Sequence, residues 1–111
     1  MKQEKQLLRI QRISDAEWSE AIKKLGVYIL YKIRGKTKYG AHSESVLGMS
    51  ALDYYTGEAI EALLSAEWEW KEEVSLSNQL TRIAWSKISA QVDNYKRRTE
   101  LYSTVELNVA G

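Results

Sequence analysis

The sequence predicts an all-α fold, a small bundle of three main helices over about residues 14–34, 50–65 and 75–98. The chain has 111 residues, of which 44% are apolar, and this suits one domain over 1–111 with a single core. It contains no Pro, the residue that interrupts helices most strongly. Serines placed before apolar repeats mark helix starts, and one uninterrupted apolar repeat marks the longest helix.

The longest predicted helix covers residues 75–98. Apolar residues recur there at intervals of three and four, which places them on one face, and no Gly lies between them. Ser75 or Ser77 can cap the start by accepting a hydrogen bond from a free backbone N–H. The repeat consists of Leu76, Leu80, Ile83, Ala84, Ile88, Val92 and Tyr95.

A second face of this helix is typical of nucleic-acid binding. At about 100° per residue, a Trp shares that face with basic and polar side chains, away from the centre of the apolar repeat. Such a surface can stack bases and neutralise phosphates. The alternative is that Trp85 packs under a neighbouring loop. The face comprises Asn78, Arg82, Trp85, Ser89 and Lys96, and Arg97 and Arg98 follow at the end of the helix.

The first predicted helix, residues 14–34, begins with Ser14 and Glu17 in the spacing of a capping box. Its core-facing residues are expected to be Trp18, Ile22, Leu25, Ile29 and Ile33. Val27 and Tyr31 lie opposite, so either the helix is buried on both faces or these two residues bind a partner. A short strand over 27–33 is the alternative to helix there. Gly35 is expected to end the helix.

The second predicted helix, residues 50–65, has a capping pair in Ser50 and Asp53. Tyr54, Glu58 and Glu61 are spaced to share an outward face. Gly57 lowers helix propensity, and a close approach of another helix would explain its presence. Two tryptophans then alternate with acids, which indicates an extended connector whose indoles cover one end of the core.

The terminal segments and the single His carry weaker signals. Residues 1–13 are predicted to form a short helix or a partly ordered arm, and 99–111 a tail or linker. His42 lies in a glycine-containing loop and is expected to be solvated. A lone His makes neither a metal site nor a catalytic dyad. The sequence thus predicts no enzyme, no metal and no cofactor.

Charge is segregated along the chain although its net value is +1. Basic segments flank an acidic middle, residues 50–73, which favours two surfaces for two partners, unless the segments pair internally. The chain has no Cys and no apolar run long enough for a membrane span, so we expect a cytoplasmic protein without membrane contact. The acids of the middle segment are Asp53, Glu58, Glu61, Glu67, Glu69, Glu72 and Glu73, with Lys71 as its only base.

This layout resembles region 2 of bacterial RNA polymerase sigma factors, particularly the small extracytoplasmic-function type. Residues 21–33 match its opening helix, and 52–64 look like its acidic helix. Residues 80–84 with 93–98 look like its long helix. In the family that helix has a Leu followed by an apolar–Ala pair, here Leu80 and Ile83-Ala84, and later an Asp that leads into a run of Arg, here Asp93 and Arg97-Arg98. Thr56-Gly57 stands where the family has Gln. The family's carboxy-terminal helix-turn-helix domain has no match in these residues, so either it has been removed or the protein works without it.

The resemblance implies two partners. The acidic helix would dock on the coiled coil of the largest subunit of core RNA polymerase, and the long helix would contact promoter DNA near the minus-ten element. The matched polymerase-binding residues are Asp53, Tyr54, Glu58 and Glu61. The matched DNA-binding residues are Arg82, Trp85, Lys87, Ser89, Lys96, Arg97 and Arg98.

Two other functions fit the same residues. The first is a helical protein–protein interaction module without DNA binding, which would use Val27 and Tyr31. The second is a small nonspecific nucleic-acid binder, although such domains usually carry a strong positive charge.

Overall fold

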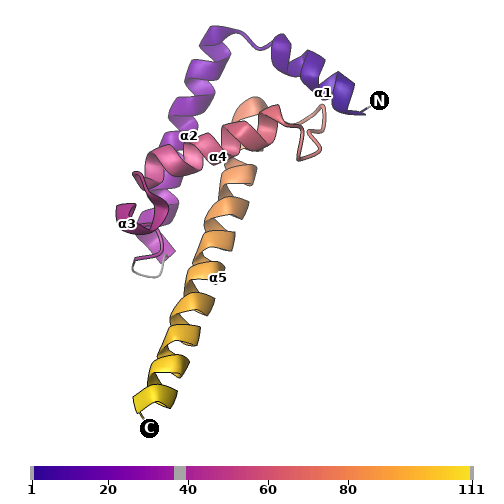
Figure 1. Cartoon of the computed structure of the whole chain (residues 1–111). Coiled ribbons are helices and arrows are strands. Elements are labelled where there is room, and N and C mark those ends of the chain that lie inside the picture. The colour runs from indigo at the N-terminus through magenta and orange to yellow at the C-terminus, as the bar shows by residue number, and fades with distance from the viewer. Residues whose placement is uncertain (1, 37–39, 111) are drawn as a thin grey trace.

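In a computed structural model, the backbone is described over residues 2–36 and 40–110, and the side chains over 3–34 and 40–101. Within these ranges the chain forms helices and no strand, which confirms the all-α prediction (Figure 1). None of these helices, over the described residues, combines the length and apolar character needed to cross a membrane. The helices are α1 (Lys2–Gln11), α2 (Asp15–Lys36), α3 (Glu44–Leu47), α4 (Ala51–Leu64) and α5 (Leu76–Ala110).

Serine side chains cap three of the helices, as their positions in the sequence predict. Ser14 Oγ accepts from the N–H of Glu17 at 3.1 Å, next to the start of α2. Ser50 Oγ accepts from the Asp53 N–H at 3.2 Å at the start of α4. Ser75 does the same for Asn78 at 3.2 Å. Each bond satisfies a donor that the first helical turn leaves without a partner.

The core lies where α2, α4 and α5 meet. In Figure 1, α2 and α5 run in the same direction and α4 lies across them. Leu25, Tyr55 and Leu80, one from each helix, are completely buried. The short-strand alternative for 27–33 is wrong, because that segment continues α2. The buried core comprises Ala21, Leu25, Ile29, Tyr55, Ala59, Ala62, Leu63, Trp70, Leu76, Leu80, Ile83, Ala84 and Ile88.

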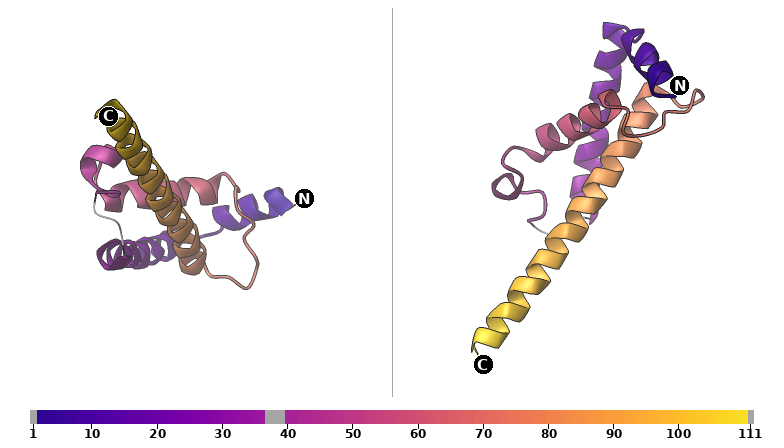
Figure 2. Two further views of the ribbon diagram at one scale, coloured as in Figure 1. Left: turned by 90° about the horizontal axis from the view of Figure 1, so that it is seen from below. Right: turned by 45° about the vertical axis from the view of Figure 1, so that its right-hand side comes forward.

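Helix α5 is longer than the sequence indicated. The helix is expected to end at residue 98, but α5 continues to Ala110, so residues 99–110 of the expected tail or linker are helical. No Gly or Pro occurs between Leu76 and Ala110, so no residue in that stretch breaks the helix. The last turns of α5 extend away from the other helices, which gives the molecule its 61 Å long axis (Figure 2).

Two glycines behave differently from expectation. Gly35 does not end α2, which runs on to Lys36. Gly57 is exposed, and a Cβ placed there would meet nothing within 4 Å, so the close helix approach expected at this position is wrong. The close approach lies at Gly26 instead, where a Cβ would lie 3.5 Å from Leu52 Cδ1. Gly26 therefore marks the contact between α2 and α4.

Helix α1 takes the helical alternative predicted for residues 1–13, and polar contacts hold it to the connector between α4 and α5. Gln6 Nε2 donates to the Trp68 carbonyl at 2.9 Å, and Gln6 Oε1 accepts from the Trp70 N–H at 3.3 Å. Arg9 donates to the carbonyls of Lys71, Glu72 and Val74 at 3.0, 3.3 and 2.7 Å. The connector also closes the end of the core, as expected, since Trp70 is buried and Trp68 packs against the core.

Candidate functional site

Trp85 on α5 belongs to an aromatic cluster shared with α2. The Lys32 ammonium lies 4.8 Å from the Trp85 ring centroid, 5.6 Å from that of Tyr28 and 5.8 Å from that of Tyr31. Trp85 remains 44% exposed and Tyr31 72% exposed. Among the described residues, the contact of the Trp85 ring is therefore with Lys32 of helix α2. A cation over exposed rings is an arrangement that can stack nucleobases while attracting phosphate.

The other residues predicted for DNA binding are distributed along α5. Arg82 is exposed, and Ser89 is partly buried. Lys96, Arg97 and Arg98 are exposed on the part of α5 that begins to leave the core. Within the part of the chain that the structure describes, none of these four cations takes part in an ion pair. Their charge is thus available to an anionic partner.

Lys87, also predicted for DNA binding, lies apart from these residues on α5. Its Nζ lies 3.8 Å from Glu67 Oε1, and the side chain is partly buried. Lys87 is two residues from Trp85, so at about 100° per residue it lies about 160° away around the helix axis. The structure therefore places Lys87 on another side of α5 from Trp85, next to Glu67 in the segment that follows α4.

The residues predicted for polymerase binding lie on α4 and differ in accessibility. Asp53 and Glu61 are exposed, and Glu58 is partly exposed. Over the described residues, none of these three carboxylates forms an ion pair. Tyr54 is partly buried instead: it packs against the core, and its ring meets Tyr55 edge-on with centroids 5.1 Å apart. The outward face of α4 is thus acidic, with Tyr54 at its border.

His42 is not the solvated loop residue expected from its sequence context. Its Nδ1 shares a hydrogen bond with the Tyr55 hydroxyl, and its Nε2 is buried without a partner among the described residues. Burial lowers the pKa of His42, because the charged imidazolium loses hydration. Burial, with Tyr54 nearby, raises the pKa of the Tyr55 hydroxyl. The pair links the loop before α3 to α4.

The same loop contacts α5. Gln91 Nε2 donates to the Ala41 carbonyl at 3.1 Å, and a Cβ at Gly40 would lie 2.6 Å from the Tyr95 hydroxyl. Ala41 is completely buried. These contacts hold the middle of α5 in place, and the exposed cations at 96–98 follow directly.

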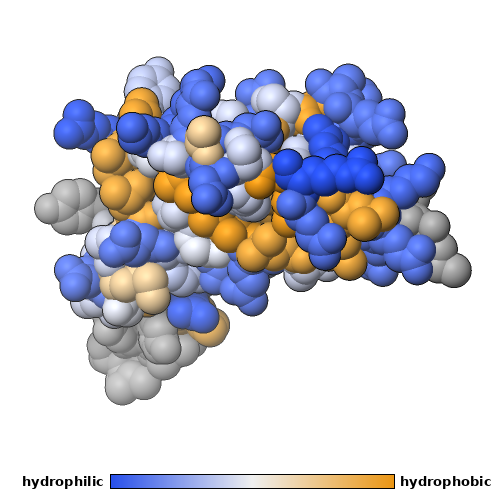
Figure 3. Space-filling model, turned by 90° about the horizontal axis from the view of Figure 1, so that it is seen from above, coloured by the Kyte–Doolittle hydropathy of each residue, from blue (hydrophilic) through white to orange (hydrophobic). Residues whose placement is uncertain are grey.

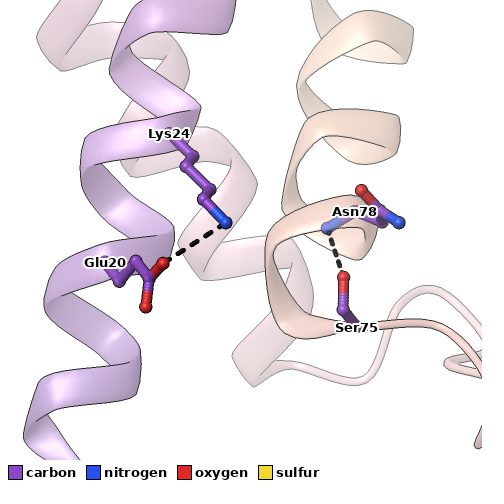
Figure 4. Close-up of polar contacts among 4 residues, drawn as sticks. All are labelled: Glu20, Lys24, Ser75 and Asn78. Carbon is purple, nitrogen blue, oxygen red and sulfur yellow. Dashed lines mark hydrogen bonds and ion pairs between the residues drawn. The ribbon is translucent and has the colours of Figure 1, made fainter.

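A groove opens at the upper end of the molecule. It has a volume of about 520 Å³ and lies between the α1–α2 corner, the connector and the start of α5. Figure 3 shows that apolar residues occupy the middle of this end and polar residues surround them. Figure 4 shows two of its polar contacts, the Glu20–Lys24 ion pair at 3.4 Å and the Ser75 cap. Charges of both signs line it, among them Arg12, Glu17 and Lys24.

Some of these contacts had no signal in the sequence. Lys32 and Tyr28 join Trp85 only because α2 and α5 pack side by side, and nothing local marks them. The three-carbonyl contact of Arg9 also depends on long-range packing. Among the described residues no group of three or more His, Asp or Glu side chains is placed to hold a metal ion.

No protein-family model, no curated protein and no solved structure matches the chain.

Proposed function

We propose that the chain is a transcription initiation factor domain similar to region 2 of bacterial sigma factors. In this proposal, α4 binds core RNA polymerase and α5 binds promoter DNA. The protein acts by binding, in the cytoplasm, and catalyses no reaction. The observation that carries the proposal is the presence of two surfaces of opposite charge on two helices of one core.

The acidic surface supports the protein contact. Asp53, Glu58 and Glu61 project from one helix, and none of them is neutralised by an ion pair over the described residues. Carboxylates without ion pairs on one helix attract a basic partner surface and speed its association. Helix α4 is held from behind by buried Tyr55 and Leu63, so its outward face is presented on a rigid support.

The basic surface supports the nucleic-acid contact. Trp85 offers a 44% exposed ring beside the Lys32 ammonium. Exposed cations at 96–98 would neutralise phosphates, which gives affinity and salt dependence without reading sequence. Stacking on exposed rings favours unpaired bases, as expected for a protein that acts on melted promoter DNA.

The test of polymerase binding is retention of purified core RNA polymerase on the immobilised chain. We expect the wild type to retain polymerase and the double variant Glu58→Lys, Glu61→Lys to lose it, because repulsion replaces attraction. Glu72→Lys with Glu73→Lys is the matched control: the charge change is equal and both residues are exposed on the connector. A wild-type chain that is folded by circular dichroism and retains no polymerase would contradict the proposal.

The alternative is a helical interaction module without DNA binding, and the exposure of Val27 and Tyr31 favours it. Replacing Arg97 and Arg98 by Gln separates the two functions. For a DNA-binding domain, the slope of log affinity against log salt should fall by about one and a half units on single-stranded DNA. Lys5→Gln with Arg12→Gln removes two exposed cations, one on α1 and one directly after it, and should leave the slope unchanged. An interaction module would bind no DNA in either variant.

A further inference from the structure

The outward face of α2 exposes large apolar side chains without a partner among the described residues. Val27 is 70% exposed, Leu30 46% and Tyr31 72%. On the opposite side of the same helix, Leu25 and Ile29 are completely buried. A cluster of this kind on a protein surface marks an interaction site more often than single scattered apolar residues do.

This face also has a regular spacing. Lys23, Val27, Leu30 and Arg34 follow one another at intervals of four, three and four residues. That spacing keeps side chains on one line along a helix and is the spacing through which two helices pack against each other. The apolar pair in the middle, with Tyr31 beside it, therefore forms a short apolar ridge with Lys23 near one end and Arg34 near the other.

The charge around the ridge is positive on balance, because the acid on this side of α2, Glu20, is paired with Lys24. From Ala21 to Arg34, helix α2 contains no acidic residue. Lys24 already pairs with Glu20, and Lys32 lies over aromatic rings. Lys23 and Arg34 are exposed, and neither has an ion pair with any described residue. These two cations are thus available to acidic groups of a partner.

We propose that this face of α2 docks an amphipathic helix of a partner protein that carries acidic residues beside its apolar ridge. The partner's apolar side chains cover Val27, Leu30 and Tyr31, and its carboxylates meet Lys23 and Arg34. Burial of the apolar ridge supplies affinity, and the two charge pairs set the register. The inference stands on α2 alone and does not rest on the proposed function.

Two other occupants fit this surface less well. A second copy would have to offer the acidic face of α4, but Gly57, which has no side chain, lies between Asp53 and Glu61 there, so no apolar ridge separates the acids. An anionic membrane would meet the two cations but would not use the four-three-four spacing, which suits the packing of a second helix.

The experiment uses three labelled helical peptides with the same apolar ridge and with Glu, Gln or Lys at the flanking positions. Fluorescence anisotropy with the full chain measures their affinities. We expect the Glu peptide to bind at least tenfold more tightly than the Lys peptide. Val27→Ser with Tyr31→Ser should weaken it at least tenfold, and Leu8→Ser, at a 52% exposed leucine of α1, should not. Lys23→Glu with Arg34→Glu should reverse the preference.

Several outcomes would overturn the inference. One is that no peptide binds, or that the three bind equally. Another is binding that the substitutions at Val27 and Tyr31 leave unchanged. Self-association of the chain in sedimentation equilibrium, abolished by Val27→Ser with Tyr31→Ser, would assign the face to a second copy. Flotation of the chain with phosphatidylserine vesicles, lost in the same variant, would assign it to a membrane.

Discussion

The Arg9 guanidinium carbon lies 3.6 Å from the centroid of the Trp70 ring, while the same guanidinium donates to three carbonyls of the connector. Trp70 is itself buried and donates from Nε1 to the Val74 carbonyl at 2.8 Å. One planar cation thus joins α1 to the segment that leads into α5. Its flat, multiply donating head group suits both the ring face and the converging carbonyls.

Arg9→Lys should loosen α1, because an ammonium keeps the charge but cannot reach three carbonyls and stack at once. We expect the free energy of unfolding to fall by about 1–2 kcal/mol, a range set by a cation–π contact and the lost hydrogen bonds. Urea unfolding measures that change, and hydrogen exchange should show faster exchange in α1. Arg12→Lys is the control, since the Arg12 side chain is exposed and makes no hydrogen bond to a described residue. Equal effects of the two substitutions would refute the role of Arg9.

His42 should make folding sensitive to mild acid. Burial lowers its pKa in the folded state below the ordinary value near 6.5, so the unfolded chain takes up the proton first. The contribution of neutral His42 to the free energy of unfolding is therefore fully present above about pH 6.5 and is lost as the pH falls through the folded-state pKa. Chemical unfolding at pH 7 and at pH 5 measures the loss. His42→Gln removes the only histidine and should flatten this dependence; an unchanged dependence in the variant would show that other groups cause it.

Gly57→Ala should stabilise the protein by about 1 kcal/mol, because Gly57 lies within α4, faces open space and adds flexibility to the unfolded chain. Gly40→Ala should destabilise it by more than that. Gly40 has a φ of +92°, and the new Cβ would lie 2.6 Å from the Tyr95 hydroxyl. Thermal unfolding of the two variants should shift in opposite directions. A shift in the same direction would contradict the placement of these glycines.

Trp85→Ala should weaken binding to single-stranded DNA about tenfold or more, because a ring that stacks a base is removed. Because Trp85 is more than half buried, overall stability should also fall, and circular dichroism checks that the variant remains folded. Trp85→Phe is the matched control, since it keeps a ring and should retain most of the affinity. Fluorescence anisotropy at fixed salt compares the three chains. Equal affinities of the Ala and Phe variants would show that stacking on the ring at position 85 does not contribute to DNA binding.

Much of the fold follows from short-range information in the sequence. The capping serines Ser14, Ser50 and Ser75 act on donors within three residues, and the apolar repeat of α5 acts through the 3.6-residue period of a helix. The same period places Val27 and Tyr31 opposite the core-facing residues of α2, although whether another element covers them is a matter of tertiary structure. These features need only local spacing, so the sequence alone determined them.

The tertiary structure decided the features that depend on which helix faces meet. The pairing of Lys87 with Glu67, the burial of His42 against Tyr55 and the three-carbonyl contact of Arg9 each join residues far apart in the chain or in separate elements. The gathering of Lys32 with Trp85 is of the same kind. Local spacing gives the direction of a side chain around its own helix, but the neighbour it meets depends on how the helices cross. That crossing is set by packing of the whole core, which no single segment contains.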